Sequence, residues 1–418
     1  MLTQQQYNLL LQNTRKLNVK IDLLNELEKK VGKLEGVCIG GSASLQGDSN
    51  YRRNCSIELV LNDSNLIPSE SSKIWLNKRI QIFIGLTDFD DNIEWFNMGK
   101  YAIQKPSLKY GVANKTISLS NLDYMAFLDG ILGGQIPNKV VIPEGVPISQ
   151  AIKSTVQTLG KITKVLIDTL MINDIEATVP FKLEFTAGST VYDIVKKLSE
   201  LYTGWEFFFN ENGYFIFQKI PDRKDDPIIW DFNQDKMKLN IDFTNDINFE
   251  NVKNSIYIWG KVMSNALQAS WVYRNKWARD TTVERDALAD KIKGDICHVN
   301  GENKSYMWDG ITWQLLGFTV IPKFNIENIG EKKYSETDDN LFNENQCKVK
   351  TEYILWKHSN LNESIGGSCV PIYGLDVNKL IAISILDVGI DGNYVLNSIN
   401  IPFDVSGNMS FSGMKMYY

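Results

Sequence analysis

The chain has 418 residues, with 43% hydrophobic side chains, 22% charged side chains and a net charge of −6 at pH 7. This length predicts about two to four domains, because one domain usually holds about 100 to 200 residues. The negative charge argues against a surface that holds nucleic acid, since such affinity comes from lysine and arginine displacing counterions.

The five cysteines argue against a disulfide framework, since their number is odd and no C-x-x-C pair occurs. They favour a reducing assembly compartment, and Cys38 and Cys55 lie within apolar alternation, as small buried side chains would. The N-terminus lacks the basic and apolar regions of a signal peptide. The longest apolar run, near "LIAISILDVGI", falls short of the about 20 residues that a membrane span needs.

The stretch "RKLNVKIDLLNELEKKVGKLEGV" at residues 15–37 allows two interpretations. A seven-residue spacing of Leu10, Leu17, Leu24 and Val31 is typical of a coiled coil, but Asn13 and Lys20 would then occupy its d positions. Strict alternation of apolar and polar residues over 17–23 favours a strand, with "NELEKK" as a hairpin tip. Residues 1–14 form either a short helix or an arm that reaches a neighbour.

Further strands follow through residue 120 at roughly ten-residue spacing, which is typical of a sandwich or barrel. They are predicted in "GVCIGGSASLQ", "NCSIELVLND", "KRIQIFIGL" and "IEWFNMGKYAIQKPSL", the last one stopped by Pro106. A hairpin is predicted around Gly111 and Asn114, "DFDDN" at 88–92 is predicted as a solvated turn, and "NLDYMAFLDG" at 121–130 as a short helix.

Residues 136–235 have the texture of a small α+β domain. Apolar residues recur at helical spacing in "PISQAIKSTVQTLG". Thr190 and Asp193 form a capping signal before a second helix that Gly204 ends. "WEFFFNENGYFIFQ" then predicts a hairpin around Asn212 and Gly213.

Residues 236–418 return to β texture, and residues 277–318 are predicted as an inserted module of a short polar helix and compact hairpins. Tyr306, Trp308 and Trp313 cluster there around an Asp309-Gly310 turn. Exposed aromatic rings could stack on sugars or contact another protein. The favoured interpretation is that they form the core of a module with few other apolar residues.

No motif for catalysis, cofactor binding or metal binding occurs in the sequence. His298 and His358 have no ligand partner at metal-site spacing. Cys297 with a distant histidine is an unspecific pairing. We therefore predict no catalytic, cofactor or metal site.

The order of several motifs resembles the hub proteins of bacteriophage tail tips and baseplates. The carriers are the first strand with "GVCIGGSASLQGDSNYRRNCSIELVL", then "WFNMGKYAIQKPSL", "LSNLDYMAFLDG", "FENVKNSIYIWG", "CVPIYGLDVNKLIAI" and "GNYVLNSINIPFDVSGNMSFSGMKM". The resemblance covers nearly the whole chain outside 277–318. That module is similar to small hairpin modules with a W-D-G-x-x-W motif in phage tail proteins.

The resemblance implies a mainly β chain with two tail-tube-like β-barrels, at residues 1–135 and 236–418. It implies a homotrimeric ring that joins the sixfold tail tube to a threefold spike or tip, with distal tail or baseplate proteins as neighbours. DNA would pass through a mildly acidic lumen without specific binding. The expected place is the virion tail baseplate or tip, assembled in the host bacterial cytoplasm. The peptidase or lysozyme domain of larger relatives is not expected here, since the chain ends in a strand.

The alternative is a receptor- or glycan-binding tail protein that acts through Tyr306, Trp308 and Trp313. Left open are a contractile or non-contractile tail, an infectious phage or a bacteriocin-like particle, the host receptor, and the role of residues 277–318.

Overall fold

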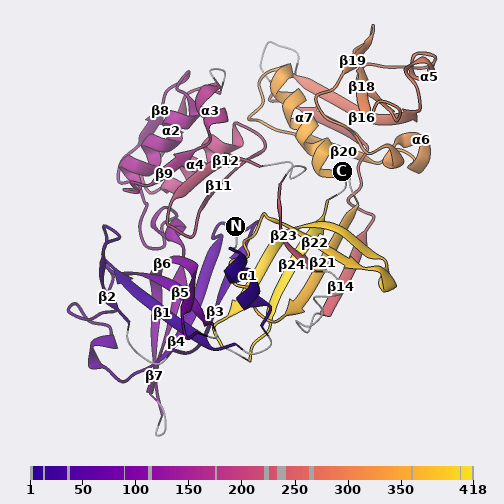
Figure 1. Ribbon diagram of the computed structural model, residues 1–418. Coiled ribbons are helices and arrows are strands. Elements are labelled where there is room, and N and C mark those ends of the chain that lie inside the picture. The colour runs from indigo at the N-terminus through magenta and orange to yellow at the C-terminus, as the bar shows by residue number, and fades with distance from the viewer. Residues whose placement is uncertain are drawn as a thin grey trace. The chain divides into compact units, whose positions relative to one another are not determined.

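Figure 1 shows the computed structural model of the protein, which describes residues 3–12, 15–34, 38–88, 90–111, 115–174, 177–220, 226–232, 242–262, 268–358, 361–404 and 406–416. The fold is mainly β, as the sequence predicts. The chain forms two compact units. The first contains residues 1–199, 205–245 and 365–414, and the second contains residues 200–204, 246–364 and 415–418.

The opening stretch is a strand followed by a hairpin turn, so the prediction from alternation is confirmed and the coiled coil is wrong. Strand β1 spans Leu17–Leu24 and β2 spans Lys30–Lys33, and the two pair antiparallel. The Asn25 side chain holds the turn by accepting hydrogen bonds from the backbone N–H groups of Leu27 and Lys29, at 3.0 and 2.9 Å. Helix α1, Gln4–Leu10, precedes the strand, and a capping box of Thr3 and Gln6 satisfies its N-terminus.

One large sheet contains the strands predicted within residues 1–135 and only part of those predicted for the second barrel at 236–418. The strands Ser255–Trp259 and Lys333–Thr337 of that predicted barrel belong to a different sheet, and the large sheet also includes a strand from the predicted α+β domain, Ile228–Phe232. The order of the large sheet is β14-β21-β24-β23-β3-β4-β7-β6-β5-β1-β2, and β13 joins through β22, which pairs with β23. The sheet has an N-terminal half, β1–β7, and a C-terminal half, which holds the other strands. The two halves meet where β3 pairs with β23, from Ser42 opposite Pro402 to Gln46 opposite Ser398. The remaining bounds are β3 Cys38–Gln46, β4 Arg53–Val60, β5 Arg79–Thr87, β6 Ile93–Tyr110, β7 Lys115–Leu122, β13 Ile228–Phe232, β14 Asp242–Asn248, β21 Asn362–Cys369, β22 Leu380–Ile385, β23 Ile390–Pro402 and β24 Met409–Lys415.

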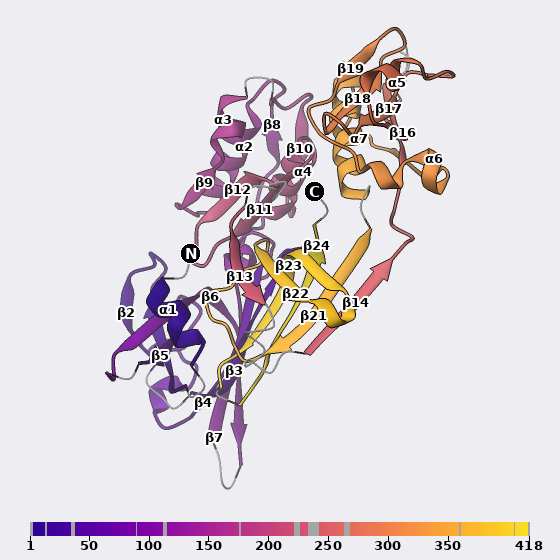
Figure 2. The ribbon, with the colours of Figure 1, turned by 45° about the vertical axis from the view of Figure 1, so that its right-hand side comes forward.

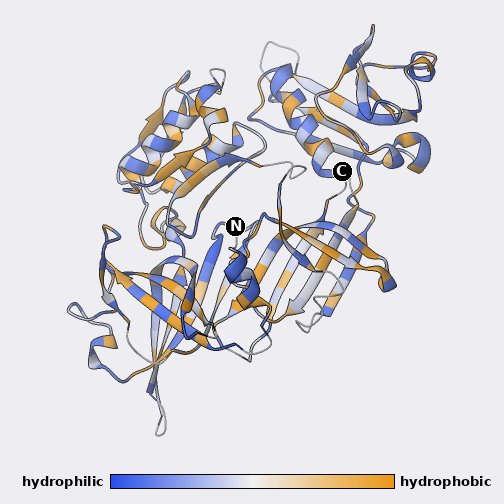
Figure 3. Ribbon diagram, in the orientation of Figure 1, coloured by the Kyte–Doolittle hydropathy of each residue, from blue (hydrophilic) through white to orange (hydrophobic). Residues whose placement is uncertain are grey.

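Alternation of apolar and polar residues along these strands places one face of the sheet in the core. Figure 3 shows hydrophobic and hydrophilic residues alternating along the strands. Ile80, Ile82 and Ile84 of β5 are fully buried, as predicted. The buried side chains of both halves form one contiguous cluster, which runs from Leu9 to Phe411 in the sequence. The halves therefore share a core as well as a sheet.

The prediction that Pro106 stops its strand is wrong, because β6 continues to Tyr110. The β5 neighbour pairs with β6 only up to Ala102, and β7 alone pairs with it beyond that point. Proline has no backbone N–H to donate. On the side of a strand that has no neighbour, this missing donor costs no hydrogen bond, so the strand can continue through the proline. The β6–β7 pair extends past the other strands in Figures 1 and 2, while residues 112–114, which include Asn114 of the predicted hairpin, lie outside the described residues.

The α+β segment of the first unit follows a 3-10 helix at Tyr124–Phe127, which lies within the short helix predicted at 121–130. The capping signal is confirmed: Thr190 N–H donates to Asp193 at 2.8 Å, and Asp193 N–H donates to the Thr190 hydroxyl at 3.1 Å. The elements are β8 Val140–Ile142, α2 Ile148–Ser154 with a π-helical turn Thr155–Leu159, β9 Val165–Ile167, α3 Thr169–Asn173, β10 Leu183–Phe185, α4 Val191–Glu200, β11 Trp205–Phe209 and β12 Phe215–Lys219.

The second unit is built on a six-stranded sheet of order β19-β18-β17-β16-β15-β20, against which helix α7 packs (Figure 2). Residues 277–318 supply β17, β18, β19 and α5. No helix within the described ranges is long and apolar enough to cross a membrane. The elements are β15 Ser255–Trp259, β16 Ser270–Arg279, α5 Thr282–Asp286, β17 Asp295–Val299, β18 Lys304–Trp308, β19 Trp313–Leu315, α6 Ile326–Ile329, β20 Lys333–Thr337 and α7 Glu344–His358.

Candidate functional site

Eight serines gather on the face of the large sheet that points away from the core. We call it the serine face and define it as Ser42, Ser44, Ser56, Ser118, Ser120, Ser398, Ser410 and Ser412, on β3, β4, β7, β23 and β24. All eight are exposed or half-buried. Strands usually favour β-branched and aromatic residues, so strand propensity does not explain this composition.

Strand register aligns the serine face into rows across neighbouring strands. One row runs from Ser42 through Ser56 to Ser120, because each residue lies opposite the next. Ser398 lies on the same face, opposite Gln46, and its hydroxyl oxygen is 2.7 Å from that of Ser412. These side chains come from both halves of the chain, so the face continues across the β3–β23 junction.

The serine face carries few charges. The row beside Ser42, Ser56 and Ser120 runs from Gly40 through Glu58 to Ser118. In these two rows across β3, β4 and β7, Glu58 is the one ionisable side chain among the described residues. Lys105 of β6 lies opposite Ser120, at the end of a row. The surface is therefore hydrated by hydroxyl groups and is nearly neutral.

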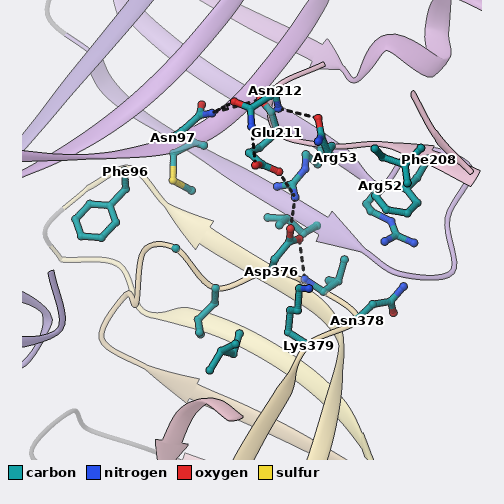
Figure 4. A pocket seen from close by; sticks show the side chains of 18 of the residues that line it. Arg52, Arg53, Phe96, Asn97, Phe208, Glu211, Asn212, Asp376, Asn378 and Lys379 are labelled. Atoms are coloured by element: carbon teal, nitrogen blue, oxygen red, sulfur yellow. Dashed lines mark hydrogen bonds and ion pairs between the residues drawn. The ribbon is translucent and has the colours of Figure 1, made fainter. Parts of the chain in front are cut away.

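A second feature is a pair of buried arginines at the start of β4, shown in Figure 4. Arg52 Nη2 lies 2.6 Å from Glu206 Oε2 of β11, and its guanidinium carbon lies 3.6 Å from the centre of the Phe208 ring. Arg53 Nη2 lies 2.5 Å from Asp376 Oδ2. Both arginine side chains are only 5% exposed.

The two arginines join three segments of the first unit. The start of β4 and the residue before it supply the arginines, the α+β segment supplies Glu206 and Glu211, and the chain between β21 and β22 supplies Asp376 and Asn378. Asn378 Nδ2 donates to Glu206 at 3.0 Å, and Arg53 lies 3.8 Å from Glu211. We call Arg52, Arg53, Glu206, Glu211, Asp376 and Asn378 the arginine node. The arginines belong to the "RR" motif that supports the resemblance to hub proteins.

Five of the six residues of the arginine node, all except Glu206, line a cavity of about 670 Å³. The charged groups of the node are paired with groups of opposite sign, since cationic Arg52 and Arg53 face the carboxylates of Glu206, Glu211 and Asp376. Burial is the largest influence and disfavours the charged guanidinium of Arg53, but Asp376, Tyr101 and Glu211 together outweigh it and hold the pKa of Arg53 above its ordinary value. These groups fix three segments of the first unit to one another.

Asp123 lies next to the arginine node and is fully buried. Its carboxylate accepts hydrogen bonds from the backbone N–H groups of Arg53, at 3.0 Å, and Met125, at 2.9 Å. Burial raises the pKa of Asp123 to about 6, and these two N–H donors offset part of that effect. The side chain caps the Tyr124–Phe127 turn, which is a structural role.

The structure brings Tyr306, Trp308 and Trp313 together on β18 and β19. Trp308 lies opposite Trp313, and their ring centres are 5.5 Å apart at an interplanar angle of 67°. Cationic groups lie over the rings: Arg285 is 4.2 Å from the Tyr306 ring centre and Lys291 is 4.9 Å from that of Trp308. All three aromatic side chains are half-buried, so the rings already have partners on their faces.

The candidate catalytic side chains of the second unit are buried and satisfied. Burial raises the pKa of the Cys297 thiol to about 11, which disfavours a nucleophilic thiolate. The His298 ring lies 3.0 Å from the Ser305 hydroxyl, and burial lowers the pKa of the imidazole. Ser305 in turn accepts a hydrogen bond from the Val320 N–H at 3.0 Å. Within the described ranges, no group of three or more His, Cys, Asp or Glu is placed to hold a metal ion.

The fold is that of phage tail proteins. A tail protein from Neisseria meningitidis matches with a TM-score of 0.57 at 11% identity, over 96% of this chain and 97% of that one. The 43 kDa tail protein of prophage MuSo2 from Shewanella oneidensis matches with a TM-score of 0.53 at 10% identity, over 94% and 98%. The prophage tail protein gp18 from Listeria monocytogenes matches with a TM-score of 0.51 at 10% identity, over 94% of each chain.

No family model matches the sequence, and no curated protein matches it by sequence. At identities of 11% and below, the likeness establishes the fold and leaves function to be argued from the surfaces.

Sequence reasoning missed both the serine face and the arginine node. The serine face was detectable in principle, because Ser42, Ser44, Ser118 and Ser120 alternate with apolar residues within their strands. The pairing of Arg52 with Glu206 and of Arg53 with Asp376 spans 154 and 323 residues and needs the tertiary structure.

Proposed function

We propose that the chain is a structural component of a phage or phage-derived tail, the hub that joins the tail tube to a spike or tip. The observation that carries the proposal is a fold shared with phage tail proteins over nearly the full length of both chains. The hub acts as a homotrimeric ring without catalysis. Its partners are the tail-tube protein, the spike or tip protein, and distal tail or baseplate proteins, and its place is the tail of the virion.

The serine face supports a role for the ring as a DNA passage. Duplex DNA carries about one negative charge per 1.7 Å of its axis and is held wherever lysine or arginine neutralises phosphates. Serine hydroxyls are hydrated and uncharged, and Lys105 at the end of one row is the one cation among the described residues of these rows, so DNA can slide along the surface. We expected a mildly acidic lumen from the sequence. The serine face, which we now propose as its lining, is instead nearly neutral.

The first experiment measures assembly. The purified chain, alone and with tail-tube protein, is examined by mass photometry and electron microscopy. The proposal predicts threefold rings, and rings at the end of tubes when tube protein is present. A chain that stays monomeric at high concentration and does not associate with tube or spike protein would refute it.

The second experiment tests the lining. In rings of the Ser56→Lys/Ser120→Lys variant, lysines would face the passing duplex, so we expect salt-dependent DNA retention that wild-type rings lack. Leu76→Lys/Ile131→Lys is the matched control, because it also adds two lysines, at exposed loop residues of the same unit with 83% and 50% exposure. Equal retention by variant and control, in rings that assemble normally, would place the serine face outside the passage.

A second candidate function is receptor or glycan binding through Tyr306, Trp308 and Trp313. The observation in its favour is that the three rings gather on one hairpin, and the observation against it is the cation over each of two rings. Replacing Trp308 and Trp313 by alanine in the particle distinguishes the two. Adsorption to host cells that falls while particles assemble normally would support this candidate, and unchanged adsorption would leave the hairpin structural.

A further inference from the structure

The large sheet is branched, and two of its terminal strands, β2 and β14, have an open side. Strand β2 pairs with β1 on one side, and β14 pairs with β21 on one side, and no described strand pairs with the other side of either. Figure 1 shows β2 and β14 at opposite ends of the sheet. An open edge presents backbone N–H and C=O groups that can pair with a strand of another chain.

The two ends carry opposite charges. Lys29, Lys30 and Lys33 are exposed at the β2 end. In the preceding turn Glu26 is exposed, and Glu28 is already paired with Lys100 and Lys164 of its own chain, so the lysines outnumber the acidic side chains at this end. Asp242 and Asp246 are exposed on β14, which contains no lysine or arginine. Lys30 also pairs with Asp22 of its own chain at 2.7 Å, and Lys29 and Lys33 add to the positive charge of the same end.

Each end also exposes aliphatic side chains beside its charges. Val31 of β2 is 52% exposed, and Leu27 in the preceding turn is 77% exposed. Ile247 of β14 is 49% exposed. Burying such side chains would add an apolar contribution of about 25 cal/mol per Å² removed from water. The two ends are therefore complementary in hydrogen bonding, in charge and in apolar contact.

We propose that the β2 end of one copy of this chain pairs with the β14 end of the next copy, so that the sheet continues across the boundary. The inference rests on the proposed function and names the surfaces by which the copies of the ring join. Such a contact is heterologous, because each copy uses two different surfaces, and heterologous contacts build rings.

The charges also exclude the competing contacts. Two β2 ends would bring lysines together, and two β14 ends would bring aspartates together, and like charges on paired strands are destabilising. Lysine at an edge by itself protects the edge from pairing. Among the pairings of these two ends, lysine at one end and aspartate at the other leave one favourable combination, which is β2 with β14.

Cysteine cross-linking tests the seam. Paired strands lie about 5 Å apart, within the Cα separation of about 4.4 to 6.8 Å that a disulfide needs. One chain carries Val31→Cys, and the other carries Thr244→Cys or Asn245→Cys, which present a thiol on either face of β14. Each chain also carries Cys38→Ser, because Cys38 is half-buried and the other four cysteines are buried.

We expect a covalent dimer when the Val31→Cys chain is mixed with a β14 variant, under conditions where the ring forms, and no dimer from either variant alone. A dimer from Val31→Cys alone, or from a β14 variant alone, in the same yield would overturn the inference. So would assembled rings that cross-link in no combination, and in that case the hub proposal stands. A chain that never assembles, with itself or with tail-tube protein, would refute the hub proposal and the seam together.

Charge reversal provides a second measurement. Lys29→Glu/Lys33→Glu should weaken assembly by about two- to thirtyfold, since two exposed ion pairs are lost. Mixing this chain with Asp242→Lys/Asp246→Lys should restore joining at the seam between the two variants. Failure of the mixture to associate more strongly than either variant alone would contradict the proposed pairing of the ends.

Discussion

Removing one charge of the arginine node should destabilise the first unit, by an amount that depends on which partner is left behind. Asp376→Asn leaves the Arg53 guanidinium, 5% exposed, with Glu211 at 3.8 Å as its remaining carboxylate. Arg53→Met leaves the Asp376 carboxylate, whose side chain is 32% exposed and reaches water. The two variants remove the same ion pair, but each leaves a different charge without its partner, and the two charges lie in different environments.

The magnitudes follow from this difference in exposure. Leaving a buried charge unpaired costs about 3 to 5 kcal/mol, and Glu211 offsets part of that cost, so we expect about 2 to 3 kcal/mol for Asp376→Asn. Leaving a carboxylate that is one-third exposed costs less, and we expect about 1 to 2 kcal/mol for Arg53→Met after screening by water. The double variant should cost little more than Arg53→Met, since no buried cation remains.

Hydrogen exchange of β4 and β11 peptides, followed by mass spectrometry, measures these losses locally and does not require the whole chain to unfold in one step. An unfolding experiment on the entire chain would mix the responses of both units. The reasoning is refuted if Arg53→Met destabilises these strands more than Asp376→Asn does, or if Asp376→Asn changes their exchange free energy by less than about 0.5 kcal/mol.

Two further predictions concern Asp123 and Gly41 of the first unit. Asp123 has its pKa raised to about 6, so the folded state binds more protons than the unfolded state between the ordinary pKa and about 6, and stability from this group rises as pH falls through that window. The unfolding free energy of the wild type minus that of Asp123→Asn should therefore increase from pH 7 to pH 5. A decrease of this quantity would contradict the raised pKa. Gly41 has φ of 142°, and an added Cβ would lie 2.3 Å from the Ser56 carbonyl oxygen, whereas Gly40 has nothing within 4 Å. Gly41→Ala should lower the melting temperature by several degrees and Gly40→Ala should change it little, and equal effects would refute this account.

The sequence predicted most of the strands, because a strand with one buried face carries its own signature. Alternation in β4 and β5 placed Ile57 and Ile80 in the core, and both are buried. The capping pair of α4 was equally local. Pro106 was misjudged because its effect depends on how many neighbours β6 has at that point, and the sequence of one strand does not contain that number.

The surfaces that support the functional proposals depend on which strands become neighbours. Ser42 and Ser120 belong to strands that are not adjacent to each other, and they share a row only because β4 lies between β3 and β7. The charges of β2 and β14 do not stand out in the sequence. They indicate a contact only once the sheet order shows that those two strands are terminal.

A heterologous contact closes into a ring only if the rotation between successive copies is fixed, and otherwise it continues as a filament. Two paired edge strands alone fix that rotation weakly, because strand pairs vary in twist by roughly 10 to 35°. Within each copy, the rotation from the β2 end to the β14 end is set by the continuous sheet, by the core that both halves share, and by Arg53, which ties β4 to Asp376. Asp376→Asn should therefore leave the seam intact while it loosens the angle between the ends. We expect open or irregular assemblies from this variant in electron micrographs, and monomers or regular rings would show that the node does not set the geometry.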